Sequence, residues 1–274
     1  GMKRFDIGNA TAGGPRLLVI AGPCVVESAE LCLEVAAQLK TACAARDLPY
    51  VFKSSYRKGN RSSGRSFAGL ALDQALAALG QVREEIGVPV LTDVHEECEV
   101  GPAAEVADAL QIPAFLCRQT GLLAAAGRSG RAVNVKKGQF LAPEDMANAV
   151  EKLRAAGCER ILLTERGTTF GYHDLVVDMR ALVVMRDLDW PVVFDATHSL
   201  QRPGGSETGG DRRFAFPLMR AAVACGVDGL FFETHPEPAR ALSDAATQLP
   251  LEQAEAFLDE ALRVHETVSE APHA

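Results

Sequence analysis

Charged and polar side chains stand at the ends of the short apolar runs in this sequence, where they could bind an anionic substrate or a metal ion. Lys53, Lys136 and Arg166 each end such a run, and Lys and Arg are seldom fully buried without a partner. Carboxylates and imidazoles end other runs in the same way, and the whole set comprises Lys53, Ser54, Ser55, Asp93, His95, Arg118, Lys136, Lys137, Glu165, Arg166, Asp195, His198, Glu233 and His235. Each residue alone could be a solvated strand end or a structural ion pair, but together they predict one shared charged pocket.

Two segments are basic and contain no acidic residue, although the whole chain has 28 Lys and Arg against 36 Asp and Glu, a net charge of −8. One is residues 52–66, FKSSYRKGNRSSGRS, and the other is residues 128–137, RSGRAVNVKK. Their cations, with Asn and Ser between them, suit phosphate groups, so we expect a phosphorylated small-molecule substrate; a solvated basic loop is the alternative. The acidic overall charge disfavours a nucleic-acid partner.

A thiol, an imidazole and two carboxylates form a possible metal site at or just beyond the ends of the first, seventh and eighth apolar runs. Its members are Cys24, His198, Glu233 and Asp244. Mixed sulfur, nitrogen and oxygen donors suit Zn²⁺, Fe²⁺ or Mn²⁺ better than Ca²⁺ or Mg²⁺. His235 and Asp195 are competing ligands, and a lone Cys is more often a small buried hydrophobic residue.

These residues can meet only if the elements before them are parallel and adjacent. Eight β-rich apolar runs recur, at Leu17–Gly22, Tyr50–Ser55, Pro89–Val94, Ala109–Ala114, Ala132–Lys137, Arg160–Arg166, Pro191–His198 and Gly229–His235. Stretches with helical spacing include Glu27–Ala45, Phe67–Glu85, Pro143–Ala156, Leu175–Arg186, Phe214–Cys225 and Leu251–Val268. Because parallel strands need long crossovers, the alternation predicts an α/β fold with a parallel sheet.

Eight such units that close on themselves form a (β/α)8 TIM barrel, in which the first and eighth strands are neighbours and all strand ends share one face. An open doubly wound sheet is the alternative, but Gly22-Pro23-Cys24 replaces the Gly-x-Gly-x-x-Gly turn that a dinucleotide-binding sheet would carry. We expect residues 1–274 to form a single barrel domain, with a short hairpin before Leu17 that caps the barrel floor.

The chain is expected to be cytoplasmic and free of membrane partners. Its seven cysteines are scattered without a Cys-x-x-Cys pair, and no apolar run reaches the roughly 20 residues of a membrane span. We also expect no signal peptide. Residues 202–213, RPGGSETGGDRR, suit either a lid over the barrel mouth or an ordinary surface loop.

Long segments throughout the chain resemble the 3-deoxy-D-manno-octulosonate 8-phosphate synthases. They include AGPCVVES, PYVFKSSYRKGNRSS, VNVKKGQFLAPEDM, LTERGTTFGYHDLVVDMR and FETHPEPARALSDAATQLPL. The resemblance implies a (β/α)8 barrel, usually tetrameric, that condenses phosphoenolpyruvate with D-arabinose 5-phosphate and water. Such a transferase releases inorganic phosphate, and its product enters the core of bacterial lipopolysaccharide.

The resemblance also implies roles for matching residues. It places phosphoenolpyruvate against Lys53, Ser55, Lys58, Ala114, Lys136 and Arg166. It places arabinose 5-phosphate against Asn60, Arg61 and Ser62, with Arg118 reaching that site from an adjacent subunit of a homotetramer. The implied catalytic residues are Lys53, Asp93, Lys136 and His198. Gly121 departs from the family, which carries Asp after the Arg-Gln-Thr motif.

The family divides into metal-dependent and metal-independent branches, and the independent branch has Asn at the position of Cys24. Cys24 therefore implies the metal-dependent branch, with one divalent ion per subunit bound by Cys24, His198, Glu233 and Asp244. Three alternatives stay open. They are the related synthase that uses erythrose 4-phosphate, a Schiff-base aldolase with Lys53 or Lys136 as nucleophile, and a barrel that binds phosphorylated sugars without catalysis.

Overall fold

Eight parallel strands close into a barrel in the computed structural model, which describes residues 1–58, 70–204 and 209–270. The ring closes because the eighth strand pairs with both the first and the seventh. In ring order the strands are β3 (Leu18–Gly22), β4 (Tyr50–Lys53), β5 (Val90–Asp93), β6 (Ala109–Ile112), β7 (Ala132–Lys136), β8 (Ile161–Glu165), β11 (Val192–Asp195) and β14 (Gly229–His235). The predicted (β/α)8 barrel is confirmed, and the alternative of an open sheet is wrong.

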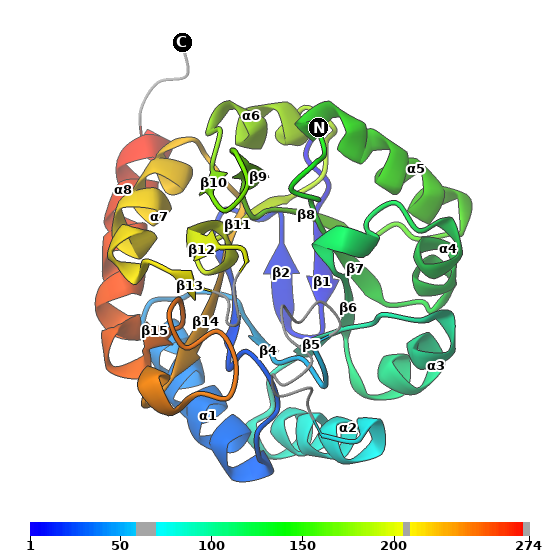
Figure 1. Ribbon diagram of the computed structural model, residues 1–274, viewed down its shortest axis with the longest axis vertical. Helices are drawn as coiled ribbons and strands as arrows, with labels where there is room; N and C mark the ends of the chain where they lie inside the picture. The colour runs from blue at the N-terminus through cyan, green and yellow to red at the C-terminus, as the bar shows by residue number, and fades with distance from the viewer. Residues whose placement is uncertain (59–69, 205–208, 271–274) are drawn as a thin grey trace.

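Helices surround the strands on the outside of the barrel (Figure 1). They are α1 (Ala29–Ala44), α2 (Leu72–Gln81), α3 (Glu97–Val106), α4 (Thr120–Arg128), α5 (Met146–Ala155), α6 (Arg180–Arg186), α7 (Ala215–Ala224) and α8 (Ala254–Glu270). Shorter helical segments are the π-turn Val82–Ile86 and the 3₁₀ turns Ala114–Leu116, Pro143–Asp145, His198–Leu200, Arg212–Phe214, Pro238–Arg240 and Leu251–Gln253. No helix in the described part of the chain is long and apolar enough to cross a membrane.

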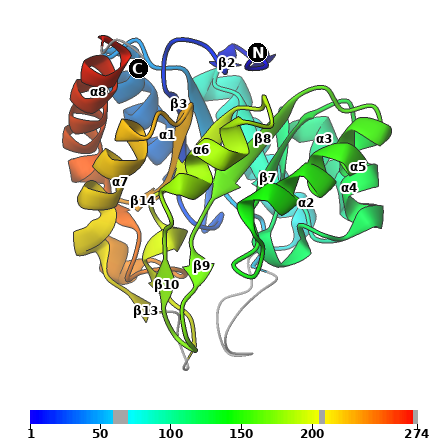
Figure 2. The same cartoon turned by 90° about the horizontal axis from the view of Figure 1, so that it is seen from above.

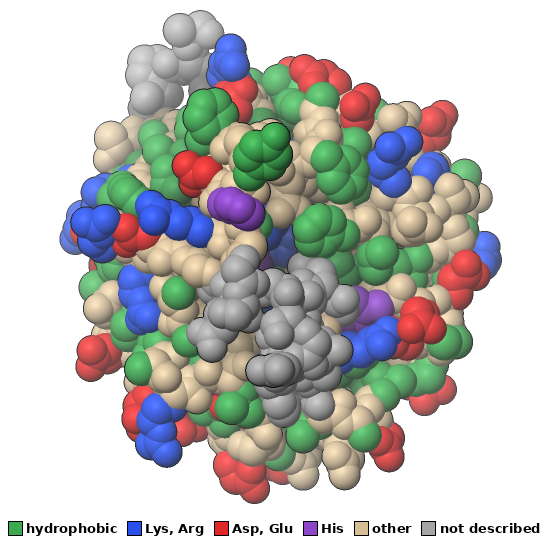
Figure 3. All heavy atoms as spheres, in the orientation of Figure 1, with side chains coloured by type: hydrophobic (Ala, Val, Ile, Leu, Met, Phe, Trp, Pro, Cys, Tyr) green, Lys and Arg blue, Asp and Glu red, His purple; other side chains and the backbone are tan. Residues whose placement is uncertain are grey.

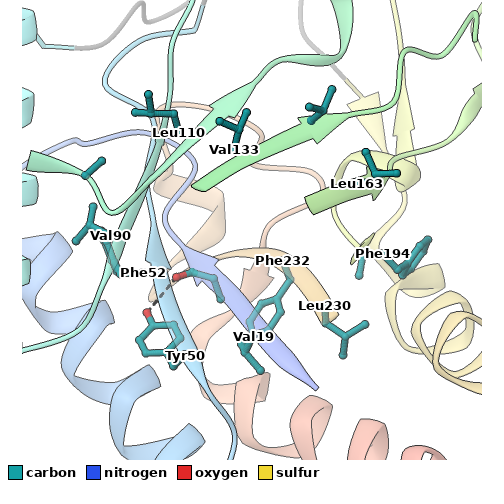
Figure 4. Close-up of a cluster of buried hydrophobic side chains, with 14 of the residues drawn as sticks. Val19, Tyr50, Phe52, Val90, Leu110, Val133, Leu163, Phe194, Leu230 and Phe232 are labelled. Atoms are coloured by element: carbon teal, nitrogen blue, oxygen red, sulfur yellow. Dashed lines mark hydrogen bonds between the residues drawn. The ribbon is translucent and has the colours of Figure 1, made fainter. Parts of the chain in front are cut away.

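The barrel strands are almost entirely apolar because both of their faces are buried. Outward side chains such as Val19, Phe52 and Phe194 pack between the barrel and the helices (Figure 4). Inward side chains, among them Leu18 and Ile20, form a second and smaller cluster inside the ring. Inside the ring Gln111, Asn134 and Thr164 hydrogen-bond to one another, and the charged side chains of these strands lie at the strand ends.

A hairpin closes one end of the barrel. Strands β1 (Phe5–Ile7) and β2 (Ala10–Ala12) pair antiparallel, and their buried side chains join the inner cluster. Figure 2 shows this hairpin at the opposite end of the barrel from β9, β10 and β13. The predicted hairpin on the barrel floor is confirmed, and any ligand must therefore enter from the other end.

Short strands decorate that open end: β9 (Thr168–Thr169), β10 (Leu175–Val176), β12 (Gln201–Arg202), β13 (Gly209–Gly210) and β15 (Leu249–Pro250). The prediction of a helix from Leu175 is wrong, because Leu175 and Val176 pair with β9 and α6 begins only at Arg180. Within residues 202–213, β12 and β13 form a two-stranded ladder, and residues 205–208 lie outside the described part.

Candidate active site

The four predicted metal ligands lie together at the carboxyl ends of three adjacent strands. Cys24 follows β3, His198 follows β11, Glu233 lies in β14 and Asp244 lies in the loop between β14 and β15. The Cys24 Sγ is 3.2 Å from Asp244 Oδ2, and the ligand atoms of Cys24, Glu233 and Asp244 all lie within 4.8 Å of one another. His198 Nε2 is 3.5 Å from both Glu233 Oε1 and Asp244 Oδ2.

The two competing candidates have other partners. Asp195 Oδ2 lies 2.7 Å from His198 Nδ1, so this carboxylate holds the ring with its Nε2 directed at the cluster. A carboxylate in this position is the usual outer partner of a metal-binding His. His235 turns away: its Nε2 is 3.4 Å from Glu27 Oε2, and its Nδ1 accepts a hydrogen bond from the Glu237 N–H.

The cluster has the chemistry of a divalent-metal site. Glu233 Oε2 is buried and lacks a hydrogen-bond partner among the described residues, which leaves an oxygen available to a cation. Burial, reinforced by the charges of Asp244 and Glu233, raises the pKa of the Cys24 thiol well above its ordinary value. A metal ion binds the thiolate and would favour the deprotonated form. The sulfur, nitrogen and oxygen donors fit the Zn²⁺, Fe²⁺ and Mn²⁺ class.

Buried cations surround this cluster. Lys53 Nζ donates hydrogen bonds to Glu233 Oε1 (2.6 Å) and to the Cys24 carbonyl (3.0 Å). Lys58 Nζ lies 3.5 Å from Glu233 Oε1 and 3.9 Å from Asp244 Oδ2. Lys136 pairs with Asp195, and burial lowers the pKa of Lys136 to about 8 although Asp195 opposes that shift.

Arg166 brings a further cation to the pocket from the end of β8. It is buried, its NH2 donates to Gln201 Oε1 (2.9 Å), and its NH1 has no partner among the described residues. Burial lowers the pKa of Arg166. An unpaired guanidinium nitrogen at the open end of a barrel is a donor available to an anionic ligand.

The residues at the carboxyl ends of β4 and β5 also lie close together. Ser55 Oγ donates a 2.6 Å hydrogen bond to Asp93 Oδ1, and both residues are buried. Burial alone would raise the pKa of Asp93, but the charges of Lys53 and His95 have a larger opposite effect. The pKa therefore lies below its ordinary value, which favours the ionised carboxylate. Ala114 begins the turn after β6 and is buried at the same end of the barrel.

Close backbone approach at Gly22 lets β3 and β4 bring Cys24 and Lys53 together. A Cβ at Gly22 would lie 1.9 Å from the Lys53 carbonyl oxygen, so a side chain at this position would force the two strands apart. Glycine is the residue type that permits such contact.

The structure does not place every predicted residue in this buried group. Asn60, Arg61 and Ser62 lie outside the described residues. Arg118 is exposed, and its carbonyl oxygen accepts a hydrogen bond from Lys152 Nζ at 3.0 Å. At Gly121, the position where the resemblance implies an aspartate, a Cβ would lie 2.0 Å from Glu97 Oε1, so a carboxylate from α3 fills the space that a side chain would need.

Two uncharged side chains of the site, both glutamines, were not among the predicted residues. Gln201 joins Arg166 to Asp244, with Gln201 Nε2 3.1 Å from Asp244 Oδ1. Gln248 Oε1 accepts a hydrogen bond from the Cys24 N–H. Charge patterns cannot reveal glutamines, although Gln248 lies within FETHPEPARALSDAATQLPL, one of the segments that resemble the family.

The closed barrel, the possible metal site and the ring of buried cations together define a class: a TIM-barrel protein with an anion-binding, metal-competent pocket at its carboxyl end. Within that class, the chain belongs to the DAHP synthetase I family, whose profile matches residues 5–270. The resemblance to the 3-deoxy-D-manno-octulosonate 8-phosphate synthases is confirmed by the relatives.

Three similar curated proteins carry the name 2-dehydro-3-deoxyphosphooctonate aldolase. The protein of Trichlorobacter lovleyi is 54% identical over 259 residues, which cover 93% of this chain and 95% of the relative. Those of Syntrophobacter fumaroxidans and Desulfatibacillum aliphaticivorans are 52% and 53% identical, and each match covers 97% of this chain and at least 93% of the relative.

Proposed function

We propose that this chain condenses phosphoenolpyruvate with D-arabinose 5-phosphate and water to form 3-deoxy-D-manno-octulosonate 8-phosphate and inorganic phosphate. The observation that carries the proposal is identity above 50% to 2-dehydro-3-deoxyphosphooctonate aldolases over nearly the whole chain. The product would enter lipopolysaccharide core synthesis. The seven free cysteines and the phosphorylated substrates favour the cytoplasm as the place of reaction.

Phosphoenolpyruvate would bind among the cations at the strand ends. Lys53, Lys58, Lys136 and Arg166 supply charge for its carboxylate and phosphate, and Ser55 and the backbone at Ala114 supply short donors. This proposal is supported by the burial of Lys53, Lys136 and Arg166 around one pocket. It is also supported by the NH1 of Arg166, which has no hydrogen-bond partner within the described ranges. Asn60, Arg61 and Ser62 would bind the second substrate, as the resemblance of the KGNRSS motif to the family implies.

The reaction joins C3 of phosphoenolpyruvate to the aldehyde carbon of the sugar, so two anionic substrates must be held roughly 3–3.5 Å apart. Positive charge develops at C2 and negative charge on the aldehyde oxygen as the bond forms. Lys53, Lys136 and Asp93 orient phosphoenolpyruvate and the sugar for this step. Water then adds to C2, and the hemiketal phosphate expels inorganic phosphate.

Cys24, His198, Glu233 and Asp244 would hold one divalent ion per subunit. This is supported by their spacing and by Glu233 Oε2, which has no hydrogen-bond partner in the part of the chain that the structure describes. When bound, such an ion would supply Lewis-acid chemistry for the aldehyde oxygen or for the water that reacts. Asp195 keeps His198 Nε2 facing that position through the bond to Nδ1.

A homotetramer would complete the site with Arg118 from a neighbouring subunit. Arg118 is exposed, and the loops after β6, β7 and β8 expose the large apolar side chains of Phe115, Phe140 and Phe170. Apolar side chains lie at several places on the face shown in Figure 3, which carries the open end of the barrel. Mixing inactive Arg118→Ala subunits with inactive Lys136→Met subunits should restore part of the activity if the arginine acts across subunits.

The decisive experiment is a phosphate-release assay with phosphoenolpyruvate and either arabinose 5-phosphate or erythrose 4-phosphate. Turnover with the five-carbon sugar alone is the expected result. Turnover only with erythrose 4-phosphate, substrate-dependent trapping by borohydride, or tight binding without turnover would each favour one of the alternatives. Exhaustive chelation should abolish activity and metal addition should restore it; turnover that survives chelation would contradict the metal-dependent assignment.

A further inference from the structure

A buried glutamine joins the possible metal site to the anion-binding arginine. Gln201 lies on β12, three residues after His198, and only 9% of its surface is exposed. Its Nε2 donates a hydrogen bond to Asp244 Oδ1 at 3.1 Å, while its Oε1 accepts one from Arg166 NH2 at 2.9 Å. One side chain thus touches a proposed metal ligand and a proposed phosphoenolpyruvate ligand.

The chemistry of the two partners fixes the orientation of this amide. An ionised carboxylate only accepts hydrogen bonds and a guanidinium only donates them, so the NH2 of Gln201 must face Asp244 and its oxygen must face Arg166. The ladder between β12 and β13 holds the backbone, with Gln201 opposite Gly210. A Cβ at Gly210 would lie 2.8 Å from the Leu200 carbonyl oxygen, which shows how closely the two strands approach.

Each of the two hydrogen bonds of Gln201 engages one atom of its partner and leaves a second atom of that partner facing the pocket. Because Gln201 engages Asp244 Oδ1, the other oxygen, Oδ2, faces Cys24 Sγ at 3.2 Å and His198 Nε2 at 3.5 Å. Because Gln201 engages Arg166 NH2, the buried NH1 remains unpartnered among the described residues. Outer hydrogen bonds of this kind orient metal-binding carboxylates.

We propose that Gln201 is a positioning residue that prepares both halves of the site: it selects the oxygen of Asp244 that binds the metal and the guanidinium nitrogen of Arg166 that binds phosphoenolpyruvate. The inference rests on the proposed function. It predicts that one substitution weakens two binding events that involve different ligands.

The test uses the full-length protein and measures each binding event without the other ligand. Zn²⁺ affinity is measured on substrate-free protein by competition with a fluorescent chelator. Phosphoenolpyruvate affinity is measured on metal-free protein by calorimetry. In Gln201→Met, which keeps the length of the side chain, we expect Zn²⁺ affinity to fall roughly 10–100-fold. Phosphoenolpyruvate affinity should fall about tenfold, since a hydrogen bond to a charged group is lost.

Gln248→Met is the matched control, because Gln248 is also buried and also makes two hydrogen bonds beside the cluster. It accepts from the Cys24 N–H at 3.3 Å and donates to the Ser243 carbonyl at 2.8 Å, but neither bond involves Arg166. This variant should lose Zn²⁺ affinity and keep the phosphoenolpyruvate affinity of the metal-free wild type. Gln201→Asn, whose amide is too short to reach both partners, should repeat the double loss and serves if Gln201→Met does not fold.

The proposal is overturned if Gln201→Met and Gln201→Asn bind both ligands like the wild type, or lose only one of the two. It is also overturned if Gln248→Met shows the same double loss, because the effect would then be general loosening of the site. Failure of the proposed function looks different: the wild-type protein itself would not bind phosphoenolpyruvate.

Discussion

Glu99 offers a quantitative test of how the segment leading to Lys58 is anchored. Glu99 Oε2 accepts hydrogen bonds from Tyr56 Oη at 2.6 Å and from two backbone N–H groups just before α3 at 2.8 and 3.0 Å. Its Oε1 pairs with Arg57 NH2 at 2.7 Å. One carboxylate therefore ties residues 56 and 57 to the start of α3, next to the residues proposed to bind substrate.

Glu99→Gln keeps the shape of the side chain and removes one acceptor. An amide has a single oxygen, so its NH2 must face either Arg57 or the three other donors. The ion pair itself contributes only about 0–1 kcal/mol, because the Arg57 side chain is 37% exposed. The larger loss comes from the hydrogen bonds, because the substitution replaces a charged acceptor with an NH2 group that faces other donors. We expect the free energy of unfolding to fall by about 2–3 kcal/mol in total.

The assay is urea unfolding at one protein concentration, with Glu96→Gln as the control. Glu96 also contacts Arg57, at 2.9 Å, but its side chain is 63% exposed, so its loss should change the free energy of unfolding by no more than about 0.5 kcal/mol. Equal effects of the two substitutions at pH 7 would refute the reasoning.

The pH dependence gives a second check on Glu99. Burial alone would raise the pKa of Glu99, but hydrogen bonds from Tyr56 and the backbone hold it below its ordinary value. A depressed folded pKa contributes stability above the unfolded pKa of about 4.3, and that stability is lost as the pH falls through the folded pKa. The difference between wild type and Glu99→Gln should narrow in acid; a constant difference would contradict the assignment.

Cys24→Asn should lower Zn²⁺ affinity at least tenfold by chelator competition, and unchanged affinity would exclude the thiol as a ligand. Ile7→Ala, at a fully buried position of the floor hairpin, should lower the free energy of unfolding by about 2–4 kcal/mol without changing kcat, since the pocket is at the other end. Because the pKa of Lys136 is lowered to about 8, phosphoenolpyruvate affinity should fall as the pH rises through 8. Binding there should take up a proton, which calorimetry in two buffers of different ionisation enthalpy detects; no buffer dependence would contradict it.

The barrel could be predicted because each of its strands can be recognised from a short stretch of sequence. A parallel strand with helices on one side and a packed interior on the other must be apolar throughout, so each strand stands out as a short run. The helix α3 was harder to predict, because it contains Gly101 and Pro102, two residue types that disfavour a helix interior. The helix predicted from Leu175 is absent although the apolar spacing there suits one. The turn at Gly171 folds Leu175 and Val176 back onto β9.

The metal cluster could be predicted only as a set of candidates. The spacing of His198 and His235 does not show which of the two is the metal ligand, since both stand at strand ends. The distinction comes from the turn after β11, in which the backbone N–H groups of Thr197 and His198 bond Asp195 Oδ1 and bring the His198 ring beside Asp195 Oδ2. Such side-chain partnerships depend on distances between strands, which a sequence does not contain.

The local sequence was least informative about the charge of the pocket. Acid-free basic segments suggested a cationic cavity, yet every buried lysine of the site has a carboxylate beside it: Glu233 beside Lys53 and Lys58, and Asp195 beside Lys136. Burial requires this pairing, because an unpaired buried ammonium would lose its proton or destabilise the fold. The acids come from β11 and β14, more than fifty residues from the lysines they pair with. Among these residues three lysines face two carboxylates, so the net positive charge is small, and a divalent cation on Glu233 and Asp244 would add to it.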